Sequence, residues 1–378
     1  MRFFLFTFFV IYGGMHLYAY LKARAALAFG SSGAIMLALF MLVMVAAPVI
    51  VRYSERFGLE LFARIMAHIG FVWGAILFLF FSSSVVIDLY TLLLYGGGFV
   101  TGKDLSRMMP SALSSFLLPL VISVLVCFYG YFEARDIRTE RIMVKTPKLP
   151  AFMQRLKIVQ ISDVHLGLMV REGRLKLILD KVRAEDPDIL VSTGDLVDGQ
   201  VCRLNGLEDL FKGVTPRYGK FAVTGNHEFY AGLENTRCFI EGAGFTLLRG
   251  ESVTVADSIT LAGVDDPAGK IYGTGKEISE RDLLSALPRE RFTLFLKHRP
   301  LVDKDAVGLF DMQLSGHIHG GQIFPFSIIT GLMYPVNSGR LGLSGGSFLY
   351  VSRGSGTWGP PIRFLSPPEV TAIELVRQ

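Results

Sequence analysis

Five short motifs in the second half of the chain contain the residue types best suited to metal chemistry. They are Asp163-Val164-His165, Gly194-Asp195, Gly225-Asn226-His227-Glu228, Lys297-His298 and Gly316-His317-Ile318-His319. Together they hold five of the seven histidines of the chain. Aspartate, histidine and asparagine can ligate a pair of divalent cations, and a carboxylate placed between the cations reduces their mutual repulsion. The motifs therefore predict a two-metal hydrolytic centre.

The elements that must position these motifs are short apolar runs, one directly before each motif. The runs cover residues 157–162, 188–193, 220–224, 292–296 and 312–315. Parallel strands gather their carboxyl ends at one edge of a sheet, so we expect motifs that are distant in sequence to converge there. Helical spacing over 174–184 supplies a crossover between strands. Gly194, Gly225 and Gly316 each precede an expected ligand, where the backbone must turn sharply or approach closely.

The order of the motifs resembles that of the calcineurin-like metallophosphoesterase superfamily. The pattern Asp-x-His, Gly-Asp-x-x-Asp, Gly-Asn-His-Glu, His, Gly-His-x-His extends from Leu156 towards the C-terminus. The later run from Gly354 to Pro361 is similar to the bacterial membrane-associated phosphodiesterase branch. The resemblance implies two facing mixed β-sheets flanked by helices, whereas the residues alone indicate only an α/β (or α+β) domain with converging strand ends.

The same resemblance implies a role for each residue of the motifs. Asp163, His165 and His319 would hold one metal; Asn226, His298 and His317 would hold the other; Asp195 would bridge them. A hydroxide shared by the metals would be the nucleophile, and His227 would stabilise charge or protonate the leaving group. The donor types suit manganese, iron or zinc, and the family favours manganese.

Four further acidic residues lie in or near the motifs, and the sequence allows more than one role for each. Asp198 either orients a ligand or caps a turn. Glu228 reads as a solvated acid at the start of a helix rather than a residue that orients a ligand. Asp265-Asp266-Pro267 is typical of an Asx-type turn rather than of a metal site.

The first part of the chain, up to about residue 132, is dominated by apolar residues and predicts an all-α transmembrane bundle. We expect four spans: Phe3–Tyr20, Gly33–Val51, one within Ile65–Tyr95, and Ser111–Phe132. A signal peptide is the alternative for the first, but no small-residue cleavage site follows it. The predicted organisation is therefore a membrane region (1–132), a juxtamembrane connector (133–155) and a phosphoesterase domain (156–378).

Cationic residues predict the orientation of this bundle. One side carries Lys22, Arg24, Lys103 and Arg107, and the other carries Arg2, Arg52, Arg56, Arg64, Arg135, Arg138, Arg141, Lys145 and Lys148. The larger group places both ends of the chain on the cytoplasmic side of a bacterial inner membrane. Cys127 lies in a span, and Cys202 and Cys238 are expected to be free, which favours a reducing compartment. The net charge of +5 gives no indication of nucleic-acid binding, because acids alternate with the bases after the fourth span.

The ligands predict the reaction but not the substrate. Residues 320–336, directly after His319, are apolar and interrupted by proline and glycine. They either pack in the core, or lie on the membrane surface or along a groove for acyl chains. The second alternative predicts a lipid or lipid-linked phosphodiester or pyrophosphate as substrate. Other hypotheses are a phosphodiesterase or phosphomonoesterase for soluble nucleotides, and a non-catalytic metal-binding regulatory module. Transport is disfavoured because the spans contain few ionisable residues apart from Asp88.

Overall fold

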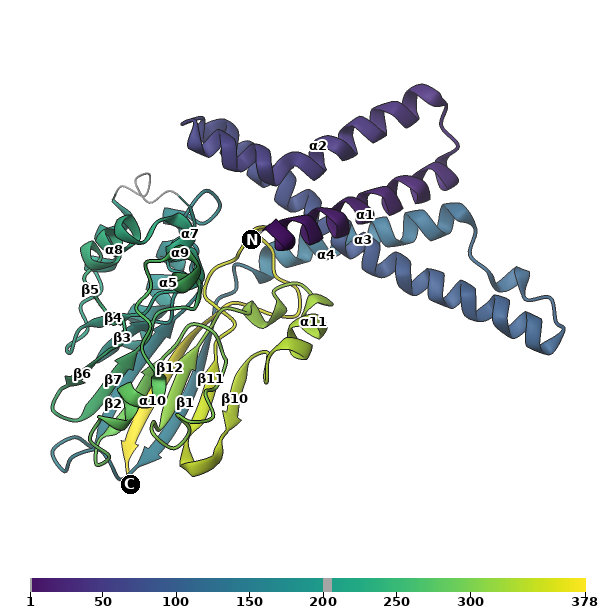
Figure 1. Cartoon of the computed structure of the whole chain (residues 1–378). Helices are drawn as coiled ribbons and strands as arrows, with labels where there is room; N and C mark the ends of the chain where they lie inside the picture. Colours follow the sequence, from purple (N-terminus) through teal and green to yellow (C-terminus); the bar gives the residue numbers. More distant parts are fainter. Residues whose placement is uncertain (1, 200–205) are drawn as a thin grey trace. The chain divides into compact units, whose positions relative to one another are not determined.

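The computed structural model describes residues 2–199 and 206–378, and the chain divides into two compact units, Met1–Tyr131 and Phe132–Gln378. The first unit is helical (Figure 1). Its helices are α1 (Arg2–Leu27), α2 (Ser31–Arg56), α3 (Glu60–Thr101), the 3-10 turn η1 (Ser106–Met108) and α4 (Ala112–Glu133). Pro48 lies inside α2 and Pro119 inside α4.

Three segments within the described residues are long and apolar enough to cross a membrane: Ser31–Arg56, Glu60–Thr101 and Ser106–Glu133. They contain the second, third and fourth expected spans. The first expected span lies in α1, which is a helix as predicted but is not one of these three. With 42 residues, α3 would extend about 63 Å at 1.5 Å per residue. It is thus longer than one crossing of a hydrocarbon core of about 30 Å requires.

Polar side chains join the helices of this unit. Asp88, the ionisable residue expected within the third span, forms an ion pair with Lys22 and accepts a hydrogen bond of 2.6 Å from Tyr18. The ring of His16 accepts a hydrogen bond of 2.9 Å from Trp73 Nε1. These contacts connect α1 to α3 and satisfy polar groups that would be costly if left unpaired in lipid.

The second unit contains two mixed six-stranded sheets, which confirms the expected architecture. The first sheet has the order β1 (Arg138–Thr146), β12 (Glu369–Arg377), β2 (Arg155–Ile161), β3 (Ile189–Ser192), β4 (Lys220–Ala222) and β5 (Phe245–Leu247). The second has the order β10 (Gly339–Gly342), β11 (Phe348–Val351), β9 (Met312–Ser315), β8 (Phe292–Leu296), β7 (Ile259–Gly263) and β6 (Glu251–Val255). The residues expected as a polar connector include β1, which pairs in parallel with β12 at the edge of the first sheet.

The central strand β2 contributes alternate side chains to two different cores. Ile158 of β2 belongs to the cluster between the sheets, together with Leu294 of β8 and Leu314 of β9. The next residue, Val159, packs on the opposite face with Leu175 and other residues of α5. This alternation follows from the two-residue period of a strand, and it requires both faces of the central strands to be apolar.

Helices and short 3-10 turns occupy the connections between strands. They are α5 (Glu172–Glu185), α6 (Leu207–Lys212), α7 (Asn226–Ala231), α8 (Leu233–Gly242), α9 (Ala268–Tyr272), α10 (Glu280–Ser285), η3 (His319–Gly321), α11 (Phe326–Met333) and η4 (Ser344–Gly346). The crossover predicted over 174–184 is α5, which connects the parallel pair β2 and β3.

Candidate metal centre

The structure brings the five motifs together at the carboxyl ends of five strands. Asp163, Asp195 and Asn226 follow β2, β3 and β4 of the first sheet, whereas His298 and His317 follow β8 and β9 of the second. The sequence argument required only one sheet edge. In the fold, the carboxyl edges of both sheets contribute to the same site, which allows ligands to approach it from two directions.

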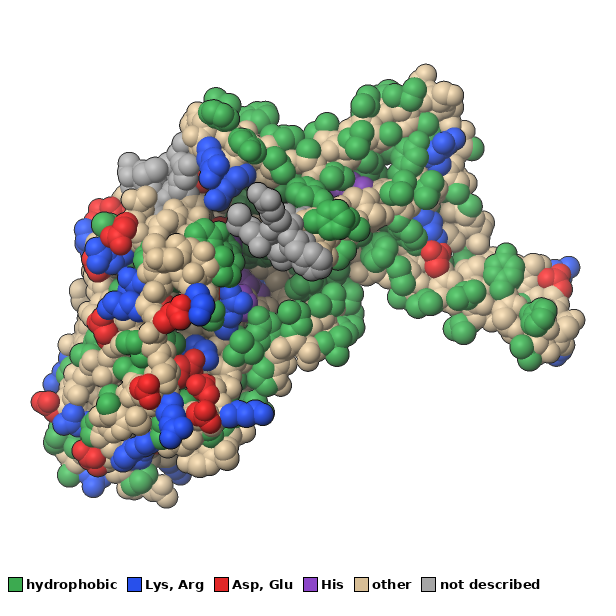
Figure 2. All heavy atoms as spheres, viewed as in Figure 1, with side chains coloured by type: hydrophobic (Ala, Val, Ile, Leu, Met, Phe, Trp, Pro, Cys, Tyr) green, Lys and Arg blue, Asp and Glu red, His purple; other side chains and the backbone are tan. Residues whose placement is uncertain are grey.

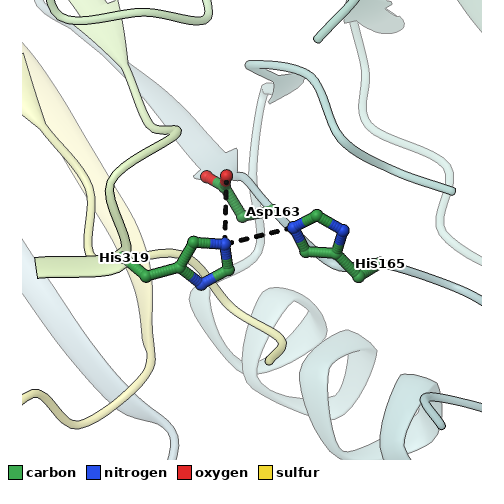
Figure 3. Close-up of side chains that lie close together, drawn as sticks. All are labelled: Asp163, His165 and His319. Carbon is green, nitrogen blue, oxygen red and sulfur yellow. Dashed lines mark hydrogen bonds and ion pairs between the residues drawn. The ribbon is translucent and has the colours of Figure 1, made fainter. Parts of the chain in front are cut away.

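One group of donors consists of Asp163, His165 and His319, whose ligand atoms lie within 4.8 Å of one another (Figure 3). The Nε2 atoms of His165 and His319 are 3.1 Å apart. His319 Nε2 is 3.4 Å from Asp163 Oδ1. All three residues are buried. These are the three residues that the resemblance assigns to the first metal.

A second group consists of Asp195, His298 and His317. Asp195 Oδ2 lies 3.1 Å from His298 Nε2, which is in turn 3.2 Å from His317 Nδ1. Asp195 also belongs to a third group, with His165 and His227, and its Oδ2 is 3.8 Å from His165 Nε2. Asp195 Oδ2 is therefore close both to His165 of the first group and to His298 of the second, as a bridging carboxylate would be.

The buried donors fit two divalent cations. Asn226 Oδ1 and His165 Nδ1 are buried and have no hydrogen-bond partner within the described part of the chain. Two pairs of imidazole nitrogens face one another at 3.1 and 3.2 Å. Buried polar atoms without partners are costly, and nitrogen lone pairs that face one another need a proton or a cation between them. Cations beside Asn226 Oδ1 and between the facing nitrogens would satisfy these donors, whereas Nδ1 of His165 lies on another side of its ring.

Electrostatics keeps several of the imidazoles in the form that binds metal, because metal binding requires the neutral ring. Burial, together with the neighbouring His227, lowers the pKa of His165 to about 4. Burial, together with His298, lowers the pKa of His317 to about 3. Burial would also lower the pKa of His298, but Asp195 raises it to about 10. Asp195 thus favours the protonated ring of His298, and a metal bound there would have to displace that proton.

The backbone at the centre adopts a conformation that side chains rarely favour. Five of the seven predicted ligands have a left-handed φ, between 50° and 76°; they are Asp163, His165, Asp195, His317 and His319. Such conformations persist only where the surrounding structure enforces them, and they occur often at functional sites. A Cβ atom on Gly225 would lie 2.1 Å from Asp195 Oδ1, and one on Gly316 would lie 2.2 Å from Asp163 Oδ2. The close approach expected at these glycines is confirmed.

His227, the predicted acid, is paired with Asp198. Its Nδ1 lies 2.9 Å from Asp198 Oδ1, and its ring centroid lies 4.7 Å from that of His165. Burial would lower the pKa of His227, but Asp195 and Asp198 raise it to about 9. The two carboxylates therefore favour the protonated ring, which is the form that a general acid requires. Asp198 contacts this histidine, a pairing that the spacing of the motifs did not predict.

The interpretation of Glu228 as a solvated acid is wrong. Glu228 is 0% exposed, and its carboxylate accepts hydrogen bonds from four backbone N–H groups. The donors are Asp195 at 3.0 Å, Leu196 at 2.8 Å, Val197 at 3.3 Å and Gly225 at 2.6 Å. The bond to Gly225 caps the start of α7, as the third residue of a helix often does. The other three fix the loop of Asp195, because α7 points its first turn at that loop.

Asp265 and Asp266 lie outside the groups of metal-binding donors. Ala268 N donates 2.8 Å to Asp266 Oδ1, which confirms the Asx-type turn. Arg299, the residue after His298, donates from Nε to Asp266 Oδ2 at 2.7 Å. Asp265 accepts from Arg249 Nη2 at 2.7 Å. Both acids therefore stabilise loops around the centre.

Arg363 is a residue of the site that sequence reasoning missed. Its guanidinium is fully buried, and its Nη2 lies 3.1 Å from His319 Nδ1. It also donates to the carbonyl oxygens of Arg353 at 2.7 Å and Gly356 at 2.6 Å. An arginine two positions after the Pro360-Pro361 pair, in an otherwise apolar run, is a weak signal of such a buried role. Arg363 connects the loop after β11 to a predicted ligand.

Aromatic and apolar side chains border the centre. The ring of Trp358 is 6.0 Å from that of His227, and the ring of Tyr334 is 5.8 Å from that of His317. Directly before Tyr334 in sequence lies α11, whose apolar residues are largely exposed, with Leu332 84% exposed. The alternative that all of residues 320–336 pack in the core is therefore wrong. A helix of eight residues with one buried position, Thr330, cannot bury its apolar face within this domain.

Comparisons with known proteins agree with this geometry. The family model for calcineurin-like phosphoesterases matches residues 156–321. A metallophosphoesterase of Aquifex aeolicus is 39% identical over 68% of this chain and 98% of its own length. A transmembrane protein with metallophosphoesterase domain from Danio rerio is 32% identical over 77% of this chain and 71% of its own. A metallophosphoesterase of Helicobacter pylori is 30% identical over 78% of this chain and 80% of its own.

The chain therefore belongs to the calcineurin-like phosphoesterase family, as its motifs indicated. The family and the clusters of histidine and aspartate suit a site for two divalent metals and a phosphoester hydrolase. The apolar helices and the transmembrane relative indicate a membrane protein.

Proposed function

We propose that the protein is a membrane-anchored, metal-dependent hydrolase of phosphodiester or pyrophosphate bonds in lipid or lipid-linked substrates. The observation that carries the proposal is the convergence of the metal-type donors beside the His227–Asp198 pair. One cation would be held by Asp163, His165 and His319, and the other by Asn226, His298 and His317, with Asp195 between them. Manganese is the proposed metal, and iron and zinc suit the same donors.

The residues around the metals would divide the remaining chemistry. Two divalent cations held there would lower the pKa of water and neutralise charge on the phosphoryl oxygens. Asp198 engages Nδ1 of His227, so Nε2 is the atom available to a substrate. From Nε2, the protonated ring would stabilise a phosphoryl oxygen or protonate the leaving oxygen. Glu228 would keep Asp195 in register through the backbone of its loop.

The proposed substrate class follows from the surroundings of the centre. The exposed apolar helix α11 begins seven residues after His319, and Trp358 lies beside His227. A nucleobase could stack on the ring of Trp358, but the exposed aliphatic residues of α11 match acyl or polyprenyl chains rather than a soluble nucleotide. The excess of cations on one side of the expected spans supports a cytoplasmic position for the centre at a bacterial inner membrane.

A hydrolysis screen with the full-length protein tests the reaction and the substrate class. Phosphomonoesters, phosphodiesters and lipid pyrophosphates are compared, with manganese supplied and with manganese removed. We expect metal-dependent hydrolysis of the phosphodiester or pyrophosphate compounds and its loss in Asp195→Asn. A variant that retains full activity without the carboxylate of Asp195 would refute the two-metal proposal.

A second comparison separates lipid from soluble substrates. Replacing Ile328, Leu332 and Met333 by serine should reduce turnover of a lipid substrate and leave turnover of a soluble aryl phosphodiester nearly unchanged. Equal loss on both substrates would exclude a role for α11 in lipid recognition. Preferential hydrolysis of nucleotides by the unmodified protein would favour the soluble-nucleotide alternative.

A further inference from the structure

The second unit has an exposed apolar surface that its own core leaves uncovered. We call it the apolar platform, and it consists of Phe324, Phe326, Ile328, Ile329, Leu332, Met333, Trp358 and Leu365. Leu332 is 84%, Met333 67%, Leu365 66% and Trp358 54% exposed. Figure 2 shows hydrophobic side chains gathered on the surface where Figure 1 draws α11. Contiguous exposed apolar surface is uncommon on soluble domains and marks an interaction site.

Two segments that are distant in sequence form this platform as one surface. Phe324 N donates to Phe364 O at 3.1 Å, and Phe364 N donates to Gln322 O at 2.9 Å. The side chain of Gln322 donates from Nε2 to Trp358 O at 2.8 Å and accepts from Trp358 N at 2.9 Å. The segment that precedes α11 and the loop that carries Trp358 and Leu365 are therefore held side by side.

The composition of the platform excludes an ordinary solvated surface. No Asp, Glu, Lys or Arg occurs between His319 and Arg340, although most large apolar residues of α11 are exposed. An exposed helix in contact with water normally carries charged residues on its outer face. A short apolar helix with neighbouring aromatic residues is instead typical of a segment that lies in a membrane interface.

The platform is also held at the point where the chain leaves the expected membrane span. Leu365 N donates a hydrogen bond of 3.2 Å to Oε2 of Glu133. Glu133 is the last residue of α4 and directly follows Phe132, where the apolar run of the fourth span ends. Arg135 is exposed two residues later, where a cation would favour anionic headgroups. Leu365 therefore lies within hydrogen-bonding distance of a residue expected at the level of the membrane interface.

We infer that the apolar platform inserts into the cytoplasmic leaflet of the bilayer in which the N-terminal helices lie. The occupant is the lipid bilayer itself, because the platform is apolar, uncharged and fixed to the end of a span. Docking in this way does not depend on hydrolysis. Its consequence, which rests on the proposed function, is that the centre beside Trp358 and Tyr334 would meet phosphoester groups at the depth of the lipid headgroups.

The two tryptophans of the chain allow a direct test, because Trp358 lies in the platform and Trp73 lies in α3. The full-length protein with Trp73→Phe, which leaves Trp358 as the sole tryptophan, is placed in nanodiscs of phosphatidylcholine and phosphatidylglycerol. Discs with lipids brominated near the headgroup end of the acyl chain are compared with unbrominated discs. We expect the brominated lipids to quench Trp358 emission, and we expect most of that quenching to be lost in Leu332→Glu/Met333→Glu.

A matched variant controls for the added charge. Phe152 is 73% exposed and lies just before the start of β2, whereas the centre follows the end of that strand. Phe152→Glu should therefore leave quenching unchanged. The milder Leu332→Ser/Met333→Ser pair should reduce quenching even if the glutamate pair fails to fold. Absence of quenching in the unmodified platform would overturn the inference. So would a dimer in detergent that the platform variants dissociate, since a second copy would then be the occupant.

Discussion

Glu228→Gln removes one charge from a carboxylate that holds two loops of the centre together. Oε2 accepts from the backbone N–H groups of Asp195 and Gly225, and Oε1 accepts from those of Leu196 and Val197. The glutamine amide has one oxygen and one NH₂ group, so either orientation leaves two buried N–H groups facing a donor. Each buried group without a partner costs about 1–3 kcal/mol.

Two such groups would cost about 2–6 kcal/mol together. The net loss of stability should lie in the lower part of that range. Burial, together with Asp195, raises the pKa of Glu228 to about 7. A neutral side chain relieves some of that unfavourable energy, and we expect a loss of about 3 kcal/mol from two unpaired N–H groups. The second unit spans residues 132–378, or 378 − 131 = 247 residues. For a domain of that size, 3 kcal/mol corresponds to a fall in Tm of about 6–12 °C.

The assay is thermal unfolding of the purified full-length protein, followed by intrinsic fluorescence with and without a chelator. Metal content is measured on the same samples. The matched control is Glu234→Gln on α8, since Glu234 is exposed and forms an ion pair with the neighbouring Arg237 of the same helix. That change should alter stability by no more than about 0.5 kcal/mol. An equal Tm for Glu228→Gln and the unmodified protein, with unchanged metal content, would refute the assignment of Glu228 as the residue that fixes the Asp195 loop.

Three further predictions concern the acid, the metals and the orientation in the membrane. Asp198→Asn should lower the pKa of His227, because Asp198 helps to raise it to about 9. Activity that requires the protonated ring should then be lost at a lower pH than in the unmodified protein. An unmoved alkaline limb of the pH–rate profile would contradict the role of His227. Chelation should lower Tm, because Asn226 Oδ1 and the facing histidine nitrogens would lose the cations proposed to satisfy them. Re-addition of manganese should restore Tm, and indifference to both treatments would argue against a structural contribution of the metals. Cys238 is free and exposed, so it can report the proposed cytoplasmic orientation. In a Cys127→Ser/Cys202→Ser background, an impermeant maleimide should label Cys238 in inverted vesicles and not in intact spheroplasts. The reverse pattern would place the domain outside the cell.

Several features of the site could be predicted from the sequence because they depend on local chemistry. Each predicted ligand follows a short apolar run, and the strands β2, β3, β4, β8 and β9 form where those runs occur. Asp163, Asp195 and His317 therefore meet at strand ends as expected. Three of the four expected spans were equally predictable, because hydropathy and length alone distinguish a spanning helix from a core helix. Cys202, which was expected to be free, lies outside the described residues.

Other features depended on packing between residues that are far apart in the chain. The charge of Glu228 suggests solvent, yet the turn between β4 and α7 directs it under the loop of Asp195. Asp198 could have capped a turn, and only the approach of α7 brings His227 within 2.9 Å of it.

The sequence by itself determined which residues could ligate metals and which segments are apolar, because residue type and periodicity are local properties. The tertiary structure decided that the carboxyl edges of two sheets, rather than one, surround the centre. It also decided that Arg363 is buried against His319 whereas the apolar residues of α11 are exposed. Burial is a property of the neighbours that a residue meets after folding, and a pattern along the chain does not contain them.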